Sequence, residues 1–220
     1  MSRRNAPAPP ALRALQLPEL TDGDADTLLA HGTYEALRFT GDDLTGVDLT
    51  AMGLTDCSFE HLNTIELELT SARLTDSQLT RLDIPTVSAT YATLRHVALE
   101  DSRLGVLQCI EGAWDTVEIR NAKLGYVNLR GATVRDVQFT DCVVEELDLT
   151  GAAVDRLCFT GTELGVLDVT GATLHDVDLR AVDLPDITGL AHLRGVAINH
   201  LQLQLLAPAL AEHLGLYVED

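Results

Sequence analysis

A hydrophobic residue returns at every fifth position from Leu37 to about Asp186, with almost no slip in the spacing. A second apolar or small residue stands two positions before most of these central residues. A period of five fits neither the 3.6 residues of an α-helical turn nor the strict alternation of a β-strand. It fits a solenoid in which five residues form one side of a square coil and twenty residues form a complete turn.

Side-chain size also indicates a turn of twenty residues, because large and small residues recur at that interval. One expected face carries all the phenylalanines in one register, at Phe39, Phe59, Phe139 and Phe159. The small inner position of another face is occupied by Met52, Ala72, Ala92, Gly112, Ala132, Ala152 and Ala172. Trp114 stands close to Gly112, so we expect the two residues to compensate each other's volume.

The repeat is clearest in the segments DLTGVDLTAMGLTD, NLRGATVRDVQF and DLTGAAVDRLCFTGTELGVLDVTGATLHDVDLRAVDL. These segments resemble the pentapeptide-repeat proteins, and the resemblance covers about two thirds of the chain. It implies an all-β solenoid, the right-handed quadrilateral β-helix of that family, with about 7–8 coils. Departures from the repeat occur at Thr64, Ala89 and Cys109 in the central column and at Asp42 in the small-residue column.

Polar and glycine positions follow the same register. We expect Ser77, Ser102 and Thr162 to point inward and to bond with the backbone of a neighbouring coil. Asp42 belongs to the first coil, where we expect it to reach solvent at an open end. Turns at the corners often need positive φ, and glycine takes the fifth pentad position at Gly41, Gly46, Gly131, Gly151, Gly161 and Gly171.

The chain divides into four segments. Residues 1–20 are expected to be a flexible arm that continues along the body of the protein, residues 21–36 a cap with Asp24 or Asp26 at the start of a short helix, and residues 37–186 the β-helix. Residues 187–220 are expected to form a helical cap or dimerisation segment, because the apolar spacing becomes helical at Leu201, Leu205, Leu206, Leu210 and Leu214.

The C-terminal segment has its own boundary signals. Asn199 is a candidate N-cap, Gly215 is a candidate stop, and Pro208 either kinks the helix or begins a second one. The segment is apolar on more than one side, so it fits both a lid over the last coil and a homodimer interface. In pentapeptide-repeat proteins a terminal helical segment often serves dimerisation, which is what the resemblance implies here.

Composition narrows the choice of partners. The sequence is 46% hydrophobic but only 4% aromatic, so the core must be built from aliphatic and small side chains. The net charge is -19 and Lys123 is the only lysine, which argues against direct binding to nucleic acid or to an anionic membrane. No stretch has the features of a secretory signal or a membrane span, so a cytoplasmic location is expected.

No motif of catalysis or cofactor binding is found, so we expect no enzyme, no cofactor and no metal site. Three cysteines, Cys57, Cys109 and Cys142, have inward register, whereas Cys158 faces outward and is a candidate reactive thiol. The seven histidines are scattered, and we expect each to lie on the surface or in a cap. His96 and His175 share a face but stand about four coils apart, or ~19 Å.

Most of the negative charge of the repeat falls on two adjacent faces. The candidate binding acids are Asp43, Asp48, Glu66, Glu68, Asp83, Glu145, Glu146, Asp148, Glu163, Asp168 and Asp183. Along the column the acids gather toward both ends, whereas residues 117–136 carry excess positive charge from Arg120, Lys123, Arg130 and Arg135. A uniformly acidic rod is therefore excluded.

Two functional hypotheses follow. The first is a non-catalytic scaffold that binds a protein partner through its outer faces. The alternative is an acidic DNA mimic, in which repeated carboxylates imitate phosphates and bind DNA gyrase or another basic DNA-binding protein. Quinolone-resistance members of the pentapeptide-repeat family act on DNA gyrase in this way, so the second hypothesis rests on the resemblance as well as on charge.

Overall fold

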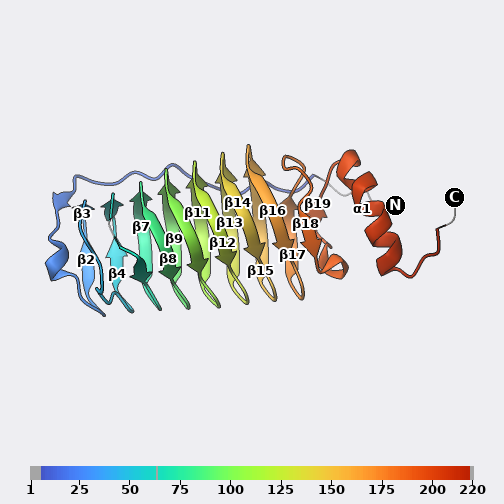
Figure 1. Cartoon of the computed structure of the whole chain (residues 1–220). Helices are drawn as coiled ribbons and strands as arrows, with labels where there is room; N and C mark the ends of the chain where they lie inside the picture. Colours follow the sequence, from blue (N-terminus) through green and yellow to red (C-terminus); the bar gives the residue numbers. More distant parts are fainter. Residues whose placement is uncertain (1–5, 63, 219–220) are drawn as a thin grey trace.

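The computed structural model describes residues 6–62 and 64–218, which form a parallel β-solenoid of about 9 turns followed by one α-helix (Figure 1). The column is longer than the 7–8 coils expected for residues 37–186 because the flanking segments also add strands. Strands β1 (Thr21–Asp22) and β2 (Thr33–Glu35) extend one end. Strand β19 (Val196–Ala197) extends the other end by pairing with β17 (Thr173–Asp178).

Two sheets make up the walls. The twelve-stranded sheet contains β1, β2, β17 and β19 together with β3 (Leu37–Thr40), β4 (Gly53–Thr55), β5 (Ser58–Glu60), β7 (Arg73–Thr80), β9 (Thr93–Glu100), β11 (Ala113–Arg120), β13 (Thr133–Thr140) and β15 (Ala153–Thr160). The seven-stranded sheet contains β6 (Glu66–Glu68), β8 (Asp83–Ser88), β10 (Arg103–Gln108), β12 (Lys123–Asn128), β14 (Val143–Asp148), β16 (Glu163–Asp168) and β18 (Asp186–Thr188).

Neighbouring strands are parallel and pair residues twenty positions apart through most of the column. Leu104 pairs with Leu124 in one sheet, and Phe139 pairs with Phe159 in the other. Each coil therefore lies over the equivalent residues of the coil before it. The predicted turn of twenty residues is confirmed.

Corner residues adopt left-handed backbone angles whether or not they are glycine. The predicted corner glycines all have positive φ, from 59° at Gly161 to 75° at Gly46. A second corner carries side chains throughout, and we call it the charged corner: Asp56, Asp76, His96, Thr116, Asp136, Arg156 and Asp176, all with positive φ. A left-handed angle costs a non-glycine residue about 1–2 kcal/mol, so the hydrogen bonds of the stacked coils must hold these corners in place.

The interior is filled with aliphatic and small side chains and two short aromatic stacks. The rings of Phe39 and Phe59 are 5.0 Å apart, and those of Phe139 and Phe159 are 5.2 Å apart. The three inward hydroxyl groups bond as predicted, because each accepts a hydrogen bond from the backbone N–H one coil earlier: Ser77 from Cys57, Ser102 from Leu82 and Thr162 from Cys142.

Both ends of the column are capped. At the first end Asp24 caps the 3-10 helix η1 (Ala25–Thr27), Leu28 is buried, and Asp42 is half-buried, with its pKa raised by that burial. At the other end lie the 3-10 helix η2 (Leu190–His192) and helix α1 (His200–His213).

The sequence signals for α1 give its boundaries. Asn199 and Gln202 form a reciprocal capping box at its start. Pro208 lies within the helix and does not begin a second one, and Gly215 follows the end of the helix with a φ of 68°. No helix in the described part of the chain is long and apolar enough to span a membrane.

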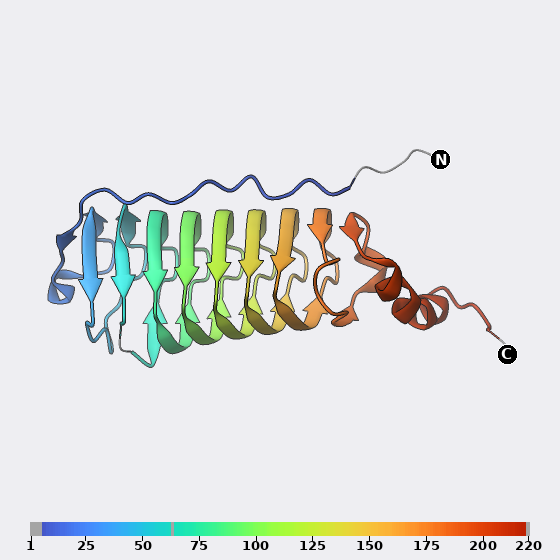
Figure 2. The ribbon, with the colours of Figure 1, turned by 90° about the horizontal axis from the view of Figure 1, so that it is seen from above.

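Residues 6–20, which we call the arm, lie in an extended conformation along the outside of the column. Figure 2 shows the arm starting near the end that carries α1 and running past successive coils to β1 at the opposite end. The sequence predicted a segment lying along the body, and the structure places it over the charged corner.

Candidate interaction surfaces

All eleven predicted binding acids belong to one side of the column, the side of the seven-stranded sheet. Eight of them lie on its strands β6, β8, β14 and β16. The backbone of Asp48 forms an isolated parallel β-bridge with Glu68 of β6. Asp43 stands forty residues before Asp83, and Asp183 stands twenty residues after Glu163, so each occupies the same position in its coil as that partner.

Asp148 does not belong to the exposed set, and the prediction that it is a binding residue is corrected. Its side chain is buried, with the Tyr126 hydroxyl donating to it at 2.9 Å and the Thr150 N–H donating at 2.9 Å. The Arg130 guanidinium is 3.7 Å away. Burial and the neighbouring carboxylate raise the pKa of Tyr126 to about 12, so this phenol remains a donor to Asp148.

Four other acids also stabilise turns. Asp43, Asp48 and Asp168 each accept a hydrogen bond from the backbone N–H two residues later, and Glu68 does the same. The hydrogen bonds from Thr45 and Thr50 lower the pKa of Asp43 and of Asp48, respectively. One oxygen of each of the four carboxylates is therefore already occupied by a backbone hydrogen bond.

Two cationic residues divide the acids into two clusters. The first acidic cluster consists of Asp43, Asp48, Glu66, Glu68 and Asp83, and the second of Glu145, Glu146, Glu163, Asp168 and Asp183. Between them, Asp83 pairs across the strands with Arg103, and Arg103 pairs with Lys123. Lys123 Nζ is 3.8 Å from a carboxylate oxygen of Glu145.

Helix α1 presents two different faces. Leu206 is buried, Leu210 is half-buried, and the Gln202 amide donates to the carbonyl oxygens of Leu179 at 2.7 Å and Val182 at 2.8 Å. This face covers the last coil. The other predicted leucines are exposed, with exposed fractions of 64% for Leu201, 59% for Leu205 and 68% for Leu214.

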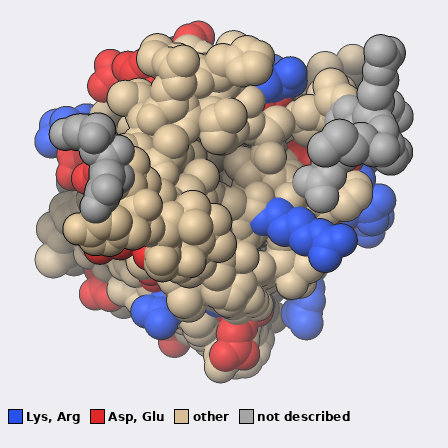
Figure 3. Space-filling model, turned by 90° about the vertical axis from the view of Figure 1, so that its right-hand side faces the viewer, with Lys and Arg blue, Asp and Glu red and all other residues tan. Residues whose placement is uncertain are grey.

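The apolar surface of α1 continues into the residues that follow it, where Leu216, Tyr217 and Val218 are also exposed. Figure 3 views the molecule from this end, and most of the visible surface there is uncharged. Of the five leucines predicted for a cap or dimer contact, Leu206 and Leu210 thus lie on the face that covers the last coil. The other three are exposed to solvent.

The charged corner was missed as a site at the sequence level. His96, expected on the surface, is buried, with its Nδ1 atom 2.5 Å from Asp76 and its Nε2 atom 3.2 Å from the Arg13 carbonyl oxygen of the arm. Asp136 is also buried and accepts two hydrogen bonds from Arg156, at 2.6 Å and 2.8 Å. A signal was present, since oppositely charged residues recur there at intervals of twenty.

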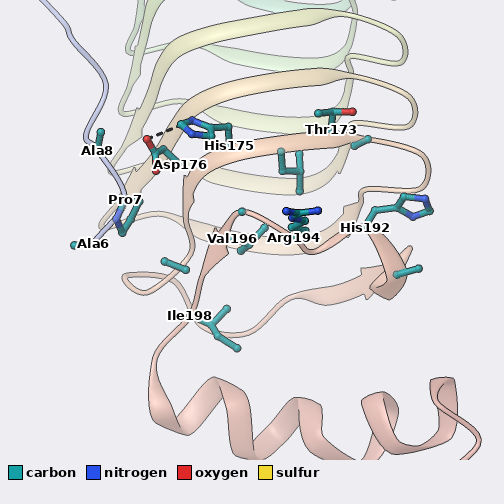
Figure 4. Close-up of a pocket in the computed structure, with 15 residues that line it drawn as sticks. Ala6, Pro7, Ala8, Thr173, His175, Asp176, His192, Arg194, Val196 and Ile198 are labelled. Atoms are coloured by element: carbon teal, nitrogen blue, oxygen red, sulfur yellow. Dashed lines mark ion pairs between the residues drawn. The ribbon is translucent and has the colours of Figure 1, made fainter. Parts of the chain in front are cut away.

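An open hollow of about 1090 Å³ lies where the arm meets the last coils, between Ala6–Ala8, Thr173–Asp176 and Ala191–Ile198 (Figure 4). On its rim, His175 Nδ1 is 2.9 Å from Asp155 and 3.3 Å from Asp176. These three side chains are close enough to share a metal ion. However, Arg156 lies 2.5 Å from Asp155, and its positive charge opposes a cation there.

Cys158 lacks the environment of a reactive thiol. It is half-buried in β15, and burial together with the charge of Asp178 raises its pKa to about 11. A thiol nucleophile reacts as the thiolate, which is scarce at neutral pH when the pKa is raised. The sequence-based hypothesis of a reactive thiol is therefore not supported.

No protein-family model and no curated protein sequence matches the chain. Among solved structures, it is similar to a trypsin-treated variant of QnrB1, described as a plasmid-mediated fluoroquinolone resistance protein. The TM-score is 0.54 and the identity 19%, covering 90% of this chain and 96% of that chain. HetL, a pentapeptide repeat protein involved in heterocyst differentiation regulation from the cyanobacterium Nostoc sp. strain PCC 7120, gives a TM-score of 0.32 and 16% identity, covering 77% of this chain and 90% of that chain.

The chain therefore has the β-solenoid fold of pentapeptide-repeat proteins. That class of fold presents long outer walls that are available for contact with other proteins.

Proposed function

We propose that this protein is a non-catalytic scaffold of the cytoplasm that binds a protein partner through the exposed acids of the seven-stranded sheet. The supporting observation is the exposure and, in the described part of the chain, the lack of ion pairing of Glu66, Asp83, Glu146 and Glu163. All four are exposed, and none takes part in an ion pair within residues 6–62 and 64–218. Solvated carboxylates on a rigid wall accelerate association with a basic partner.

Capture of proteins from an extract of the source cells tests this proposal. Immobilised wild-type protein is compared with a Glu145→Lys, Glu146→Lys variant and with a Glu111→Lys, Asp115→Lys control, which changes the net charge equally outside the seven-stranded sheet. We expect a basic protein to be retained by the wild type and the control and lost with the first variant. Equal retention by all three would contradict binding through this sheet.

A second candidate is DNA mimicry directed at DNA gyrase. It is supported by the two acidic clusters on one wall and by the similarity in fold to QnrB1, which is described as a fluoroquinolone resistance protein. The proposal predicts that the purified protein inhibits DNA supercoiling by gyrase, and that added salt weakens the effect steeply because charged contacts are screened. If the protein neither inhibits supercoiling nor binds gyrase at low salt, this candidate is excluded.

We also propose that a second copy of the chain covers the open face of α1. An exposed apolar surface that continues from Leu201 through Val218 is unusual for a monomer in water, and a twofold interface would bury it. Light scattering should give twice the mass of one chain. A monomeric mass at micromolar concentration would count against this interface.

A further inference from the structure

The arm is held by a small number of specific contacts with the charged corner. The Ala11 N–H donates to Asp136 at 2.7 Å, the Arg13 carbonyl oxygen lies 3.2 Å from His96 Nε2, and the Arg13 guanidinium is 3.8 Å from Asp76. All three corner residues come from successive or nearby coils of one column. The arm therefore lies across the coils and contacts them through side chains of the corner.

The corner groups are positioned independently of the arm. Asp136 is fixed by the two hydrogen bonds from Arg156, and His96 is fixed by Asp76. Rigid donors and acceptors of this kind can bind a flexible segment without being reordered themselves. The surface is thus preorganised, and the arm is the part that becomes ordered.

The charged corner binds groups of the arm that many other extended peptides also have. Two of the contacts involve backbone groups, the N–H of Ala11 and the carbonyl of Arg13, which any extended peptide can supply. Side chains contribute through Arg13 and through six half-buried residues whose spacing alternates between three and two: Pro7, Pro10, Leu12, Leu15, Leu17 and Leu20.

The arm is also weakly held. Every residue from 6 to 20 is half-buried or exposed, and none of them forms a strand with either sheet. The ion pair of Arg13 with Asp76 joins side chains with exposed fractions of 71% and 35%, and exposed pairs contribute little to stability. The arm remains in place mainly because its attachment to β1 keeps its local concentration high.

We propose that the charged corner is a peptide-binding surface, that the arm occupies it as an internal ligand, and that a partner protein binds there by displacing the arm. The displacing segment has the chemistry of the arm: extended, with prolines or leucines every two to three residues and one arginine. This surface lies apart from the acidic clusters and from α1, so the inference does not depend on the proposed function.

The test uses the full-length chain and a fluorescein-labelled peptide of residues 6–20. A variant with Leu12→Asp, Leu15→Asp and Leu17→Asp loosens the arm without altering the column. Fluorescence anisotropy should show peptide binding to this variant and binding about tenfold weaker or more to the wild type, where the attached arm competes. Equal binding to both proteins, or binding to neither, would overturn the proposal.

A second pair of changes locates the peptide. Added to the loosened variant, Asp136→Asn should weaken peptide binding severalfold, whereas the control Asp141→Asn, an exposed acid on another corner, should leave it unchanged. An equal effect of the two changes would place the peptide elsewhere and overturn the assignment.

Hydrogen exchange in the isotope-labelled wild type provides a measurement that needs no variant. In the protein alone, the Ala11 amide should be protected from hydrogen exchange. It should exchange faster when unlabelled peptide is added in excess. No acceleration at saturating peptide would overturn displacement. If light scattering instead showed a dimer of the wild type that is lost in the loosened variant, the occupant would be the arm of a second copy, and the intrachain assignment would be wrong.

Discussion

Gly112 lies where the interior of the column has no room for even one more side-chain atom. A Cβ atom at this position would lie 2.4 Å from the Cys109 sulfur and 2.8 Å from the Ala92 carbonyl oxygen. The sulfur in turn lies 3.1 Å from Trp114 Nε1, which donates a hydrogen bond to it. Gly112 thus leaves room for the large sulfur atom that satisfies the buried indole. The sequence predicted that Gly112 and Trp114 compensate each other's volume, whereas the atoms nearest to a Cβ at Gly112 belong to Cys109 and Ala92.

We expect Gly112→Ala to lower the free energy of unfolding by about 1–3 kcal/mol, because the added methyl overpacks the core. Urea denaturation would measure the change. Gly53→Ala is a matched control, since its added Cβ would have no neighbour closer than 3.6 Å. A loss of stability in the control as large as that in Gly112→Ala would point to backbone entropy or strand propensity as the cause, and against overpacking.

Asp136 should make stability depend on acidity. The hydrogen bonds from Arg156 lower its pKa below the ordinary 3.8. A carboxylate with a depressed folded-state pKa stabilises the fold fully above its unfolded pKa, and this contribution disappears as pH falls through the folded value. The contribution of Asp136 is therefore present at neutral pH and lost in acid.

The melting temperature of the wild type should exceed that of Asp136→Asn at neutral pH, and the difference should shrink below about pH 4. Thermal denaturation followed by circular dichroism across that range would show this. Asp141→Asn, at an exposed corner, should differ little from the wild type at any pH. A constant difference for Asp136→Asn would mean that packing, and not charge, is what the substitution removes.

At the scale of elements, the repeats were predictable and the contacts between separate segments were not. The period of five placed Phe139 over Phe159 and turned Ser102 inward, because every coil repeats the same local environment. The burial of His96 depends on the arm, whose Arg13 is 83 residues away and lies outside the repeating coils. Asp148 was misassigned for a similar reason, since its burial depends on the size and reach of Tyr126 in the neighbouring coil.

Helix α1 combines two functions that single substitutions should separate. Leu206→Glu places a charge in the face that covers the last coil, and we expect it to lower the free energy of unfolding by about 2–5 kcal/mol. Leu205→Glu changes the open face, so the fold should remain intact while any dimer is weakened. Thermal denaturation and light scattering together distinguish the two results.

The comparison is informative in either direction. Equal destabilisation by Leu205→Glu and Leu206→Glu, with unchanged mass, would indicate that the whole helix packs on the column and that no second copy binds it. Loss of the dimer only in Leu205→Glu would support the proposed interface.

At the scale of the whole molecule, the acidic wall is interrupted at its centre. Arg103 on β10 and Lys123 on β12 lie between Asp83 on β8 and the nearest acids of the second cluster on β14, three strand spacings away, or ~14 Å at the usual spacing. A small basic partner can reach one cluster, whereas a partner with an extended basic surface would meet both clusters and the two cations between them. Replacing Arg103 and Lys123 by acidic residues therefore tests whether the wall acts as a continuous anionic surface.

We expect an Arg103→Glu, Lys123→Glu variant to bind an extended basic partner about tenfold more tightly than the wild type at low salt, because two repulsive contacts become attractive. Binding to gyrase, measured by fluorescence anisotropy at low and high salt, is the first assay. Arg73→Glu with Arg95→Glu gives the same change in net charge on the twelve-stranded sheet, and both of these arginines are exposed. If affinity rises only in the first variant, the partner spans the seven-stranded sheet. If both variants bind alike, net charge alone governs the association, and the arrangement of the acids on this wall carries no specificity.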